Sequence, residues 1–167
     1  MKQTVTKNGV GAWTERKYDV EKAAGTLAFT DDLRFGPELL HARAVRSTVA
    51  HGEILSIDFS EALKVKGVVK VVTGKDFVHR FGLYLMDRTP MAIGKVRYMG
   101  EPVALVIAES EEAAEEGMLK VTAKYRELPA VFDPIQAATD NGVLVHPELE
   151  TYERVPYRTP QPGTNIA

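Results

Sequence analysis

The sequence contains no cysteine. This absence excludes disulfide bonds, thiolate zinc sites, cysteine-ligated iron–sulfur clusters and a cysteine nucleophile. The N-terminal stretch MKQTVTKNGVGAWTERKYD lacks the apolar segment of a secretory signal. No apolar run approaches the ~20 residues that a membrane-spanning helix needs. From these absences we expect a cytoplasmic protein.

A surplus of charge is absent as well. Lys and Arg total 21 and Asp and Glu total 23, which gives a formal charge of -2. This balance indicates neither a nucleic-acid partner nor an acidic disordered chain. The hydrophobic fraction of 44% and the charged fraction of 26% are ordinary for a globular protein. A length of 167 residues suits one domain with one core, or one domain with a tail.

Residue patterns predict an α+β domain with a mixed sheet and a few helices. Apolar and alternating runs predict strands over 27–30, 39–46, 54–59, 68–73, 103–108 and 121–128. Turn residues between the second and third of these predict a hairpin. Helices are expected over 60–67, from Ser110 onward, and over 133–142. We expect residues 1–26 to form an irregular arm, 74–95 an irregular loop and 148–167 an extended, proline-rich tail.

The stretch VRYMGEPVALVIAESEEAAEEG, residues 96–117, raises the question of catalysis most directly. Glu101 could be the acid of an active-site turn. However, Gly100 favours a bend, and Pro102 is tolerated at the first position of a strand. The apolar run from Val103 is typical of a central strand covered on both faces, and Ser110 is typical of a helix N-cap. Turn chemistry therefore explains Glu101 without a catalytic role.

Other candidate groups do not combine into a site either. The GVGAWT stretch lacks the third glycine of a dinucleotide fingerprint, and TGKD lacks the first glycine and the magnesium-binding hydroxyl of a phosphate loop. The histidines are not spaced to share a helix face, adjacent carboxylates in a turn are usually solvated, and no serine has nucleophile-elbow context. We assign no catalytic, cofactor-binding or metal residue. The groups considered were His41, His51, His79, His146, Asp31, Asp32, Ser47 and Ser110.

Five stretches in order resemble one known domain. They are AAGTLAFTDDL, LLHARAVRSTVAHGEILSID, ALKVKGVVKVVTGKD, KVRYMGEPVALVIAESEEAAEEG and KYRELPAVFDPIQA. Together they resemble the α/β hammerhead domain at the N-terminus of the molybdenum-binding subunit in the xanthine dehydrogenase/aldehyde oxidase family of molybdenum hydroxylases. The resemblance covers roughly residues 10–167. Two departures stand out: Ser47 is followed by TVAHG where the family usually has Pro-His-Ala, and Glu101 stands where the family often has Gln.

The resemblance implies an oxidoreductase that hydroxylates a heterocycle or aldehyde with water as oxygen source. It implies a molybdenum–pterin cofactor, iron–sulfur clusters and usually FAD in the complete enzyme, none of them bound by this chain. Residues 1–147 would be the hammerhead domain, and 148–167 a linker toward a missing molybdopterin-binding domain. The implied partners are that domain or subunit and the iron–sulfur and flavin domains or subunits. The module would pack on the molybdopterin domains, help form the substrate channel and be inactive alone.

Two other classes of function stay open at this point. One is a non-enzymatic binding or interaction module that reuses the hammerhead fold. The other is a biotinyl- or lipoyl-type carrier, although no lysine stands in a convincing carrier motif. Substrates from purines and nicotinate-like rings to aldehydes and aromatic thioesters are all compatible with the sequence. We also expect residues 74–95 to be loosely packed in the isolated chain, because a partner would cover their aromatic side chains.

Overall fold

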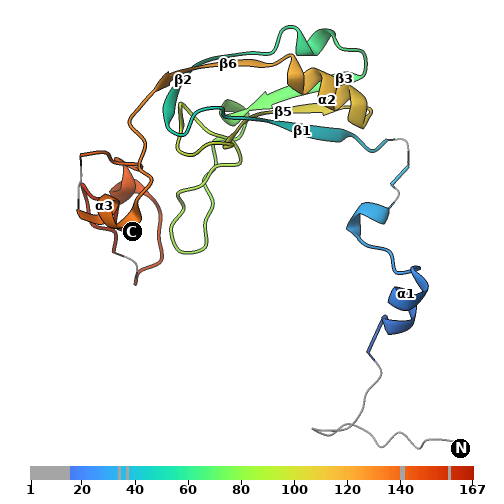
Figure 1. Ribbon diagram of the computed structural model, residues 1–167, viewed down its shortest axis with the longest axis horizontal. Helices are drawn as coiled ribbons and strands as arrows, with labels where there is room; N and C mark the ends of the chain where they lie inside the picture. Colours follow the sequence, from blue (N-terminus) through green and yellow to red (C-terminus); the bar gives the residue numbers. More distant parts are fainter. Residues whose placement is uncertain (1–15, 34, 37, 140–141, 158) are drawn as a thin grey trace, which may run out of the picture. The chain divides into compact units, whose positions relative to one another are not determined.

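The computed structural model describes residues 16–33, 35–36, 38–139, 142–157 and 159–167. Its contacts divide the chain into two compact units, Met1–Pro37 and Glu38–Ala167. The first unit contains α1 (Asp19–Ala24) and a 3-10 helix at Thr30–Asp32 (Figure 1). No described residue of this unit is buried. The arm predicted as irregular thus includes one short helix, and the strand predicted over 27–30 is wrong.

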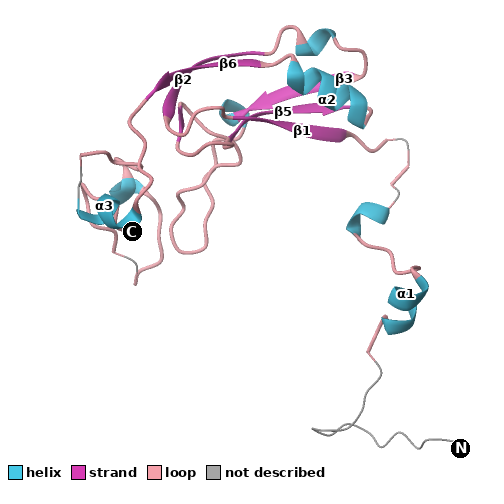
Figure 2. Ribbon diagram, in the orientation of Figure 1, coloured by secondary structure: helices cyan, strands magenta, loops and turns pink. Residues whose placement is uncertain are grey.

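The second unit contains two three-stranded sheets (Figure 2). The first sheet has the order β1 (His41–Arg46), β5 (Pro102–Ala108) and β3 (Val68–Thr73). The second has the order β4 (Lys95–Val96), β2 (Gly52–Asp58) and β6 (Thr122–Glu127). All pairings in both sheets are antiparallel. The α+β class is confirmed, whereas the predicted mixed sheet is wrong.

The predicted hairpin between the first two strands is also wrong. β1 pairs with β5, and β2 pairs with β4 and β6, so the turn after β1 carries the chain from one sheet to the other. A hairpin would have left the apolar residues of β5 without a second neighbour in the first sheet. The helix predicted over 60–67 is only a 3-10 helix at Ala62–Lys64. Gly67 then takes φ 92°, the left-handed turn expected there.

β5 is the centre of the core. Val103, Ala104, Val106 and Ala108 are all fully buried, although neighbours in a strand point to opposite faces. On one face Val103 packs with residues of the second sheet such as Val96. On the other face the buried residues meet the 3-10 helix and α2 (Glu111–Leu119). The prediction of a central strand covered on both faces is confirmed.

α2 begins where the sequence predicts. The Ser110 hydroxyl accepts a hydrogen bond from the backbone N–H of Ala113 at 3.2 Å, which caps the helix. Gly117 lets the helix lie close to the first sheet, because a Cβ there would stand 2.9 Å from methyl groups of Val106 and Val68. The pairing of Glu116 with Lys120 one turn later also holds, at 2.7 Å.

The remaining part of the second unit is the loop-and-tail region, defined here as residues 77–94 and 130–167. It includes α3 (Pro134–Thr139) and a 3-10 helix at Leu149–Thr151. An isolated bridge joins Leu85 to Arg154, and Leu149 and Tyr152 are buried. Within the segment 148–167, predicted as an extended linker, residues 153–155 therefore pair with residues 84–86 of the loop. Within the described residues, no helix has the length and apolar content needed to cross a membrane.

Candidate interaction site at the loop-and-tail region

Arg97 joins the sheets to the tail. It follows β4, and its side chain is 16% exposed. Its Nε donates to the carbonyl oxygen of Val145 at 3.2 Å, and its Nη2 donates to the Glu148 carboxylate at 2.8 Å. A half-buried guanidinium that bonds both a carbonyl and a carboxylate fixes the position and direction of its partners. The tail is therefore held at a defined place beside the β4–β5 turn.

Glu101, the acid that the sequence singles out, closes the same turn. Its carboxylate accepts the backbone N–H of Arg97 at 2.5 Å, and Gly100 between them has φ 86°. Burial raises the pKa of Glu101 above its usual value, although the hydrogen bond from Arg97 acts in the opposite direction. No nucleophile or second carboxylate bonds to it among the described residues. The geometry supports the interpretation of Glu101 as part of the turn.

A hydrogen-bond chain continues from Glu148 into the tail. The Tyr152 hydroxyl donates to Glu148 at 2.7 Å, and Nδ1 of His146 lies 2.8 Å from the same hydroxyl. Burial raises the pKa of Glu148, but the Tyr152 hydrogen bond and the charge of Arg97 outweigh it, so the net pKa is lowered. Burial and the hydrogen bond to Glu148 raise the pKa of Tyr152. Arg80 covers the Tyr152 ring at 4.4 Å from its centroid.

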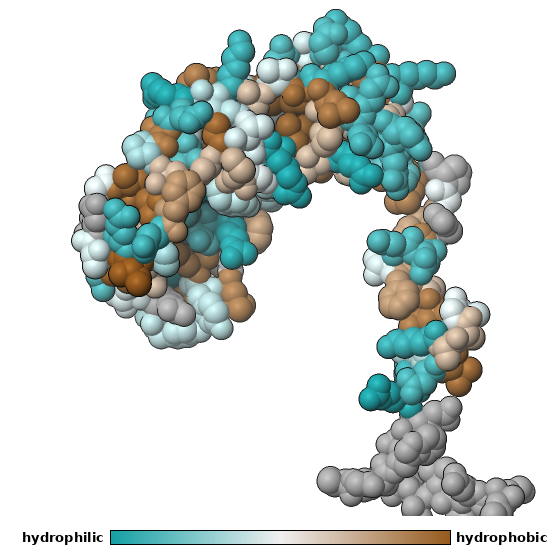
Figure 3. Space-filling model, viewed as in Figure 1, coloured by the Kyte–Doolittle hydropathy of each residue, from teal (hydrophilic) through white to brown (hydrophobic). Residues whose placement is uncertain are grey.

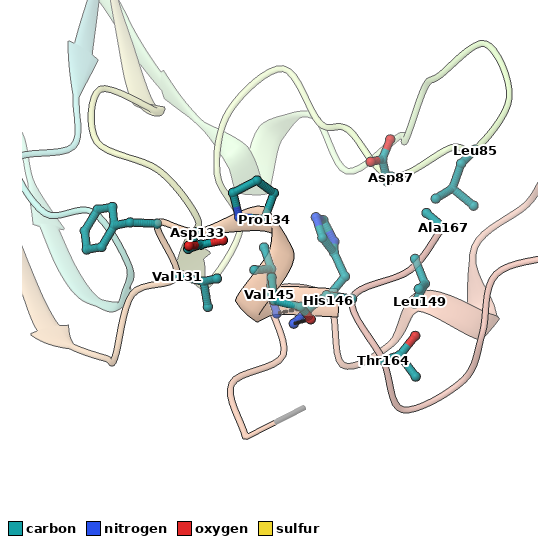
Figure 4. Close-up of a pocket in the computed structure, with 13 residues that line it drawn as sticks. Leu85, Asp87, Val131, Asp133, Pro134, Val145, His146, Leu149, Thr164 and Ala167 are labelled. Atoms are coloured by element: carbon teal, nitrogen blue, oxygen red, sulfur yellow. Dashed lines mark hydrogen bonds between the residues drawn. The ribbon is translucent and has the colours of Figure 1, made fainter. Parts of the chain in front are cut away.

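Burial and the positive charge of Arg97 hold the pKa of His146 below its usual value, although the charge of Asp87 acts in the opposite direction. The imidazole is therefore neutral at neutral pH. It lines two clefts, one of about 370 Å³ and one of about 500 Å³, and Asp87 lines both. In Figure 4 the His146 ring projects into the smaller cleft, and Asp87 lies on the loop at its edge. The remaining residues of that cleft are Leu85, Val131, Phe132, Asp133, Pro134, Ala137, Val145, Leu149, Thr164, Asn165 and Ala167.

Exposed apolar side chains surround these clefts. A groove of about 800 Å³ runs between the 81–88 loop and the end of the tail. Figure 3 shows apolar residues at the surface around α3. Such a concentration is typical of a surface that another protein or domain covers. The exposed residues of the loop-and-tail region are Phe77, Val78, Phe81, Leu83, Tyr84, Met86, Ile93, Phe132, Ile135 and Tyr157.

The other candidate histidines do not join His146. His41 lies at the start of β1, 3.7 Å from Glu111, and His79 is exposed. His51 is buried, and its Nδ1 lies 2.6 Å from the carbonyl oxygen of Pro129. His51 therefore anchors the chain where it leaves β6. Among the described residues, no group of three or more His, Asp or Glu side chains could hold a metal ion.

The remaining candidates serve local structure. Asp32 accepts the backbone N–H of Phe29 at 2.9 Å, and Asp76 of the TGKD stretch accepts that of Thr73 at 2.8 Å. The Ser47 hydroxyl bonds both backbone groups of Val49 within the turn after β1. Asp31 makes no hydrogen bond to another described residue. The glycines of GVGAWT lie outside the described residues.

Sequence reasoning missed the residues that organise this site. Arg97 and Glu148 are separated by 51 positions, and although Arg97 lies in the stretch KVRYMGEPVALVIAESEEAAEEG, nothing in that stretch indicates its partner. Asn165 is similar: its side chain bonds backbone groups of Ala137, Val143 and Val145. No local signal in the sequence could have linked these positions, because each contact depends on the tertiary path of the tail.

Comparisons with known proteins agree with the fold. Residues 24–129 match the family described as "Aldehyde oxidase and xanthine dehydrogenase, a/b hammerhead domain". The chain is 36% identical over 127 residues to a probable xanthine dehydrogenase subunit of Bacillus subtilis, covering 75% of this chain and 17% of that protein. It is 32% identical over 139 residues to the "Nicotinate dehydrogenase large molybdopterin subunit" of Eubacterium barkeri, covering 80% of this chain and 32% of that protein.

A solved structure gives the same result. Aldehyde oxidoreductase from Desulfovibrio gigas superposes with a TM-score of 0.72 at 34% identity, covering 80% of this chain and 16% of that one. The chain thus spans less than a third of the length of each of these relatives. The chain belongs to the aldehyde oxidase and xanthine dehydrogenase family, of which it carries the α/β hammerhead domain.

Proposed function

We propose that this chain is the hammerhead module of a xanthine dehydrogenase-like oxidoreductase and is inactive alone. It packs through its loop-and-tail region on the molybdopterin-binding part of the enzyme and helps form the substrate channel. The observation that carries the proposal is the exposed apolar surface of residues 77–86, in a chain whose family match is to a domain of a larger enzyme. Isolated domains rarely expose so many large apolar side chains together unless another surface covers them.

The chemistry belongs to groups held outside this chain. The absence of cysteine excludes cysteine-ligated iron–sulfur clusters, and the described residues contain no His/Asp/Glu group suited to a metal. We therefore assign no residue of this chain to the molybdenum–pterin cofactor, to the iron–sulfur clusters or to FAD. The name of the nicotinate dehydrogenase relative supports a molybdopterin-bearing large subunit as the setting of this domain.

A role in the substrate channel is supported by the position of the clefts. Several clefts open along the 81–88 loop, and two of them share His146 and Asp87. A partner that covers the exposed side chains of this loop would convert such open clefts into enclosed passages. The identity of the substrate does not follow from them, because the relatives' names point to different molecules.

The test is recovery of molybdenum with the tagged chain from its native host. We expect molybdenum and pterin in the purified fraction, measured by elemental and organic mass spectrometry. Leu83→Ser on the loop should abolish this recovery, since Leu83 is 80% exposed within the proposed interface. Leu119→Ser is the matched control, because Leu119 is 75% exposed on α2, outside the loop-and-tail region.

A chain that elutes as a free monomer, with no molybdenum-bearing partner, would contradict the proposal. That result would favour the rival function, a binding or interaction module that has its own ligand. Amide exchange provides a second measurement. We expect fast exchange over residues 77–86 in the isolated chain and slow exchange in the complex, because only the complex buries these side chains.

A further inference from the structure

The cleft of about 370 Å³ has a distinct chemical character. Its walls are mostly apolar, with Leu85, Val131 and Leu149 among them. Its charged lining is acidic, because Asp87 and Asp133 contribute carboxylates and none of the described lining residues is Lys or Arg. A cleft that combines apolar walls with carboxylates and has no Lys or Arg in its lining favours a cation that carries an apolar stem.

Of the two carboxylates, Asp87 is the one that remains available as a hydrogen-bond or ion-pair acceptor. It has no hydrogen bond or ion pair to a described residue, whereas Asp133 is partly occupied. Oδ1 of Asp133 accepts the backbone N–H groups of Ile135 and Gln136 at 2.7 and 3.1 Å, which caps α3. Because Asp87 is half-buried, its carboxylate is partly removed from water and is available to pair with a cation in the cleft.

Hydrogen-bond direction fixes the role of His146. Glu148 is ionised and can only accept, so the Tyr152 hydroxyl must give its single proton to Glu148. The contact between Tyr152 and Nδ1 of His146 then requires Nδ1 to carry the proton. In the neutral ring Nε2 is left as an acceptor, and it bonds no described residue. The cleft thus presents an acceptor nitrogen as well as a carboxylate.

We propose that this cleft binds an organic cation, a protonated amine or guanidine on an apolar stem, through Asp87 and His146. We assign the cation to a Lys or Arg side chain of the docked molybdopterin-binding part, and this assignment rests on the proposed function. Leu85 and Asp87 line both this cleft and the groove beside the exposed loop, so a partner seated on that loop reaches the cleft directly. An anion is disfavoured, because the charged side chains that line this cleft, Asp87 and Asp133, are negative.

A small-molecule titration tests the site without any partner. The full 167-residue chain is titrated with n-butylammonium chloride, and with n-butanol as its neutral analogue, while backbone amide shifts are recorded by NMR. We expect saturable shifts at residues 85–87 and 145–149 with the ammonium ion, and affinity about tenfold weaker for the alcohol. Equal affinity for the two probes would overturn the proposal.

Three variants sharpen this test. Asp87→Asn should weaken ammonium binding about tenfold, because it removes the charged acceptor. Glu150→Gln removes an equal charge from an exposed position of the 3-10 helix in the tail and should leave binding unchanged. His146→Asn keeps a donor near the Nδ1 position for Tyr152 but removes the Nε2 acceptor, so binding should weaken while the fold is kept. If Glu150→Gln weakens binding as much as Asp87→Asn, the effect is general electrostatics and the site is refuted.

The source of the cation is tested separately by molybdenum recovery with Asp87→Asn. Reduced recovery supports a partner side chain in the cleft. Undiminished recovery of molybdenum would show that no side chain of the partner supplies the cation. Ammonium binding by a chain that recovers no molybdenum would uphold the cation site while refuting the proposed function, so the two failures are distinguishable.

Discussion

The two sheets and the loop-and-tail region are stabilised in different ways. The sheets surround β5, where Val103 and Val106 are fully buried and pack against both neighbouring layers. The loop-and-tail region also buries some apolar side chains, such as Leu149, but its tail is joined to the sheets by single polar contacts, such as those of Arg97 with Val145 and Glu148. Apolar packing is spread over many atoms, whereas a polar clamp depends on a few. The second region is therefore the part that a partner could reshape.

The same difference separates what the domain buries from what it exposes. Large apolar residues of the sheets, such as Val71 and Val96, are buried, whereas Leu83 and Phe132 of the loop-and-tail region lie in solvent. Folding of the chain alone buries the core of the sheets but leaves the apolar side chains of the loop exposed. We infer that the sheets act as the scaffold and the loop-and-tail region as the surface for assembly. The following substitutions test this division.

Val106→Ala should have the largest effect. Val106 is fully buried in β5, and removal of two methyl groups leaves a cavity between the sheet and α2. We expect a loss of about 2–3 kcal/mol in the free energy of unfolding, measured with urea. Val69→Ala on β3 is the control, because Val69 is 52% exposed and its loss should cost under about 0.5 kcal/mol. Similar costs at the two positions would refute a core centred on β5.

Arg97→Met should affect the loop-and-tail region alone. It removes the hydrogen bonds to Val145 and Glu148 and leaves the half-buried Glu148 carboxylate with only the longer contact to Arg80, at 3.9 Å, as its ion pair. We expect a local cost of about 1–2 kcal/mol, seen as faster amide exchange over residues 145–152 with unchanged exchange in β5. Arg126→Met is the control, since Arg126 pairs with Glu53 at an exposed position on the second sheet. Equal acceleration in β5 would show that the two regions unfold together.

The same division explains what could be predicted from the sequence. Local rules identified β5 and α2 correctly, because Gly100, Pro102 and Ser110 act on their immediate neighbours. Strand pairing could not be derived from such local rules. The turn after β1 would also permit a hairpin, and what excludes the hairpin is that β5 pairs with β1 on one edge and with β3 on the other. The prediction of a mixed sheet was wrong for the same reason. The order of five family motifs, rather than any pattern of hydrophobicity, identified the hammerhead fold.

The candidate site was less predictable than the fold. His146 was considered only as one of four unconnected histidines, and Arg97 was not considered. The contacts of Arg97 join segments about 50 residues apart, and sequence spacing contains no record of such a contact. The proline-rich composition of the tail suggested an extended chain, yet Asn165 and the 3-10 helix at Leu149–Thr151 fold it. In this tail, hydrogen bonds from single side chains to distant backbone groups decide the conformation, although the composition is typical of an extended chain.

Ser110→Ala tests a local rule inside the scaffold. The substitution removes the hydroxyl that accepts the N–H of Ala113, so α2 loses its N-cap. We expect a loss of about 1 kcal/mol in the free energy of unfolding. Ser110→Asp should restore most of it, because a carboxylate also accepts this hydrogen bond and suits the positive end of the helix. If the Asp variant were as unstable as the Ala variant, capping would not be the cause.

Glu101→Gln has the smallest expected effect and acts at the joint between the two regions. Glu101 has a pKa raised chiefly by burial, so its contribution to stability is complete at low pH and is lost as the pH rises through the folded-state pKa. A glutamine keeps an acceptor for the N–H of Arg97 but carries no charge. The variant should therefore match the wild type near pH 4 and exceed it by a few tenths of a kcal/mol near pH 7, measured by urea unfolding at both pH values. Glu101→Ala removes the acceptor and should be destabilised at both. A Gln variant that is less stable than the wild type near pH 7 would instead show that the negative charge itself stabilises the turn, through attraction to the Arg97 guanidinium.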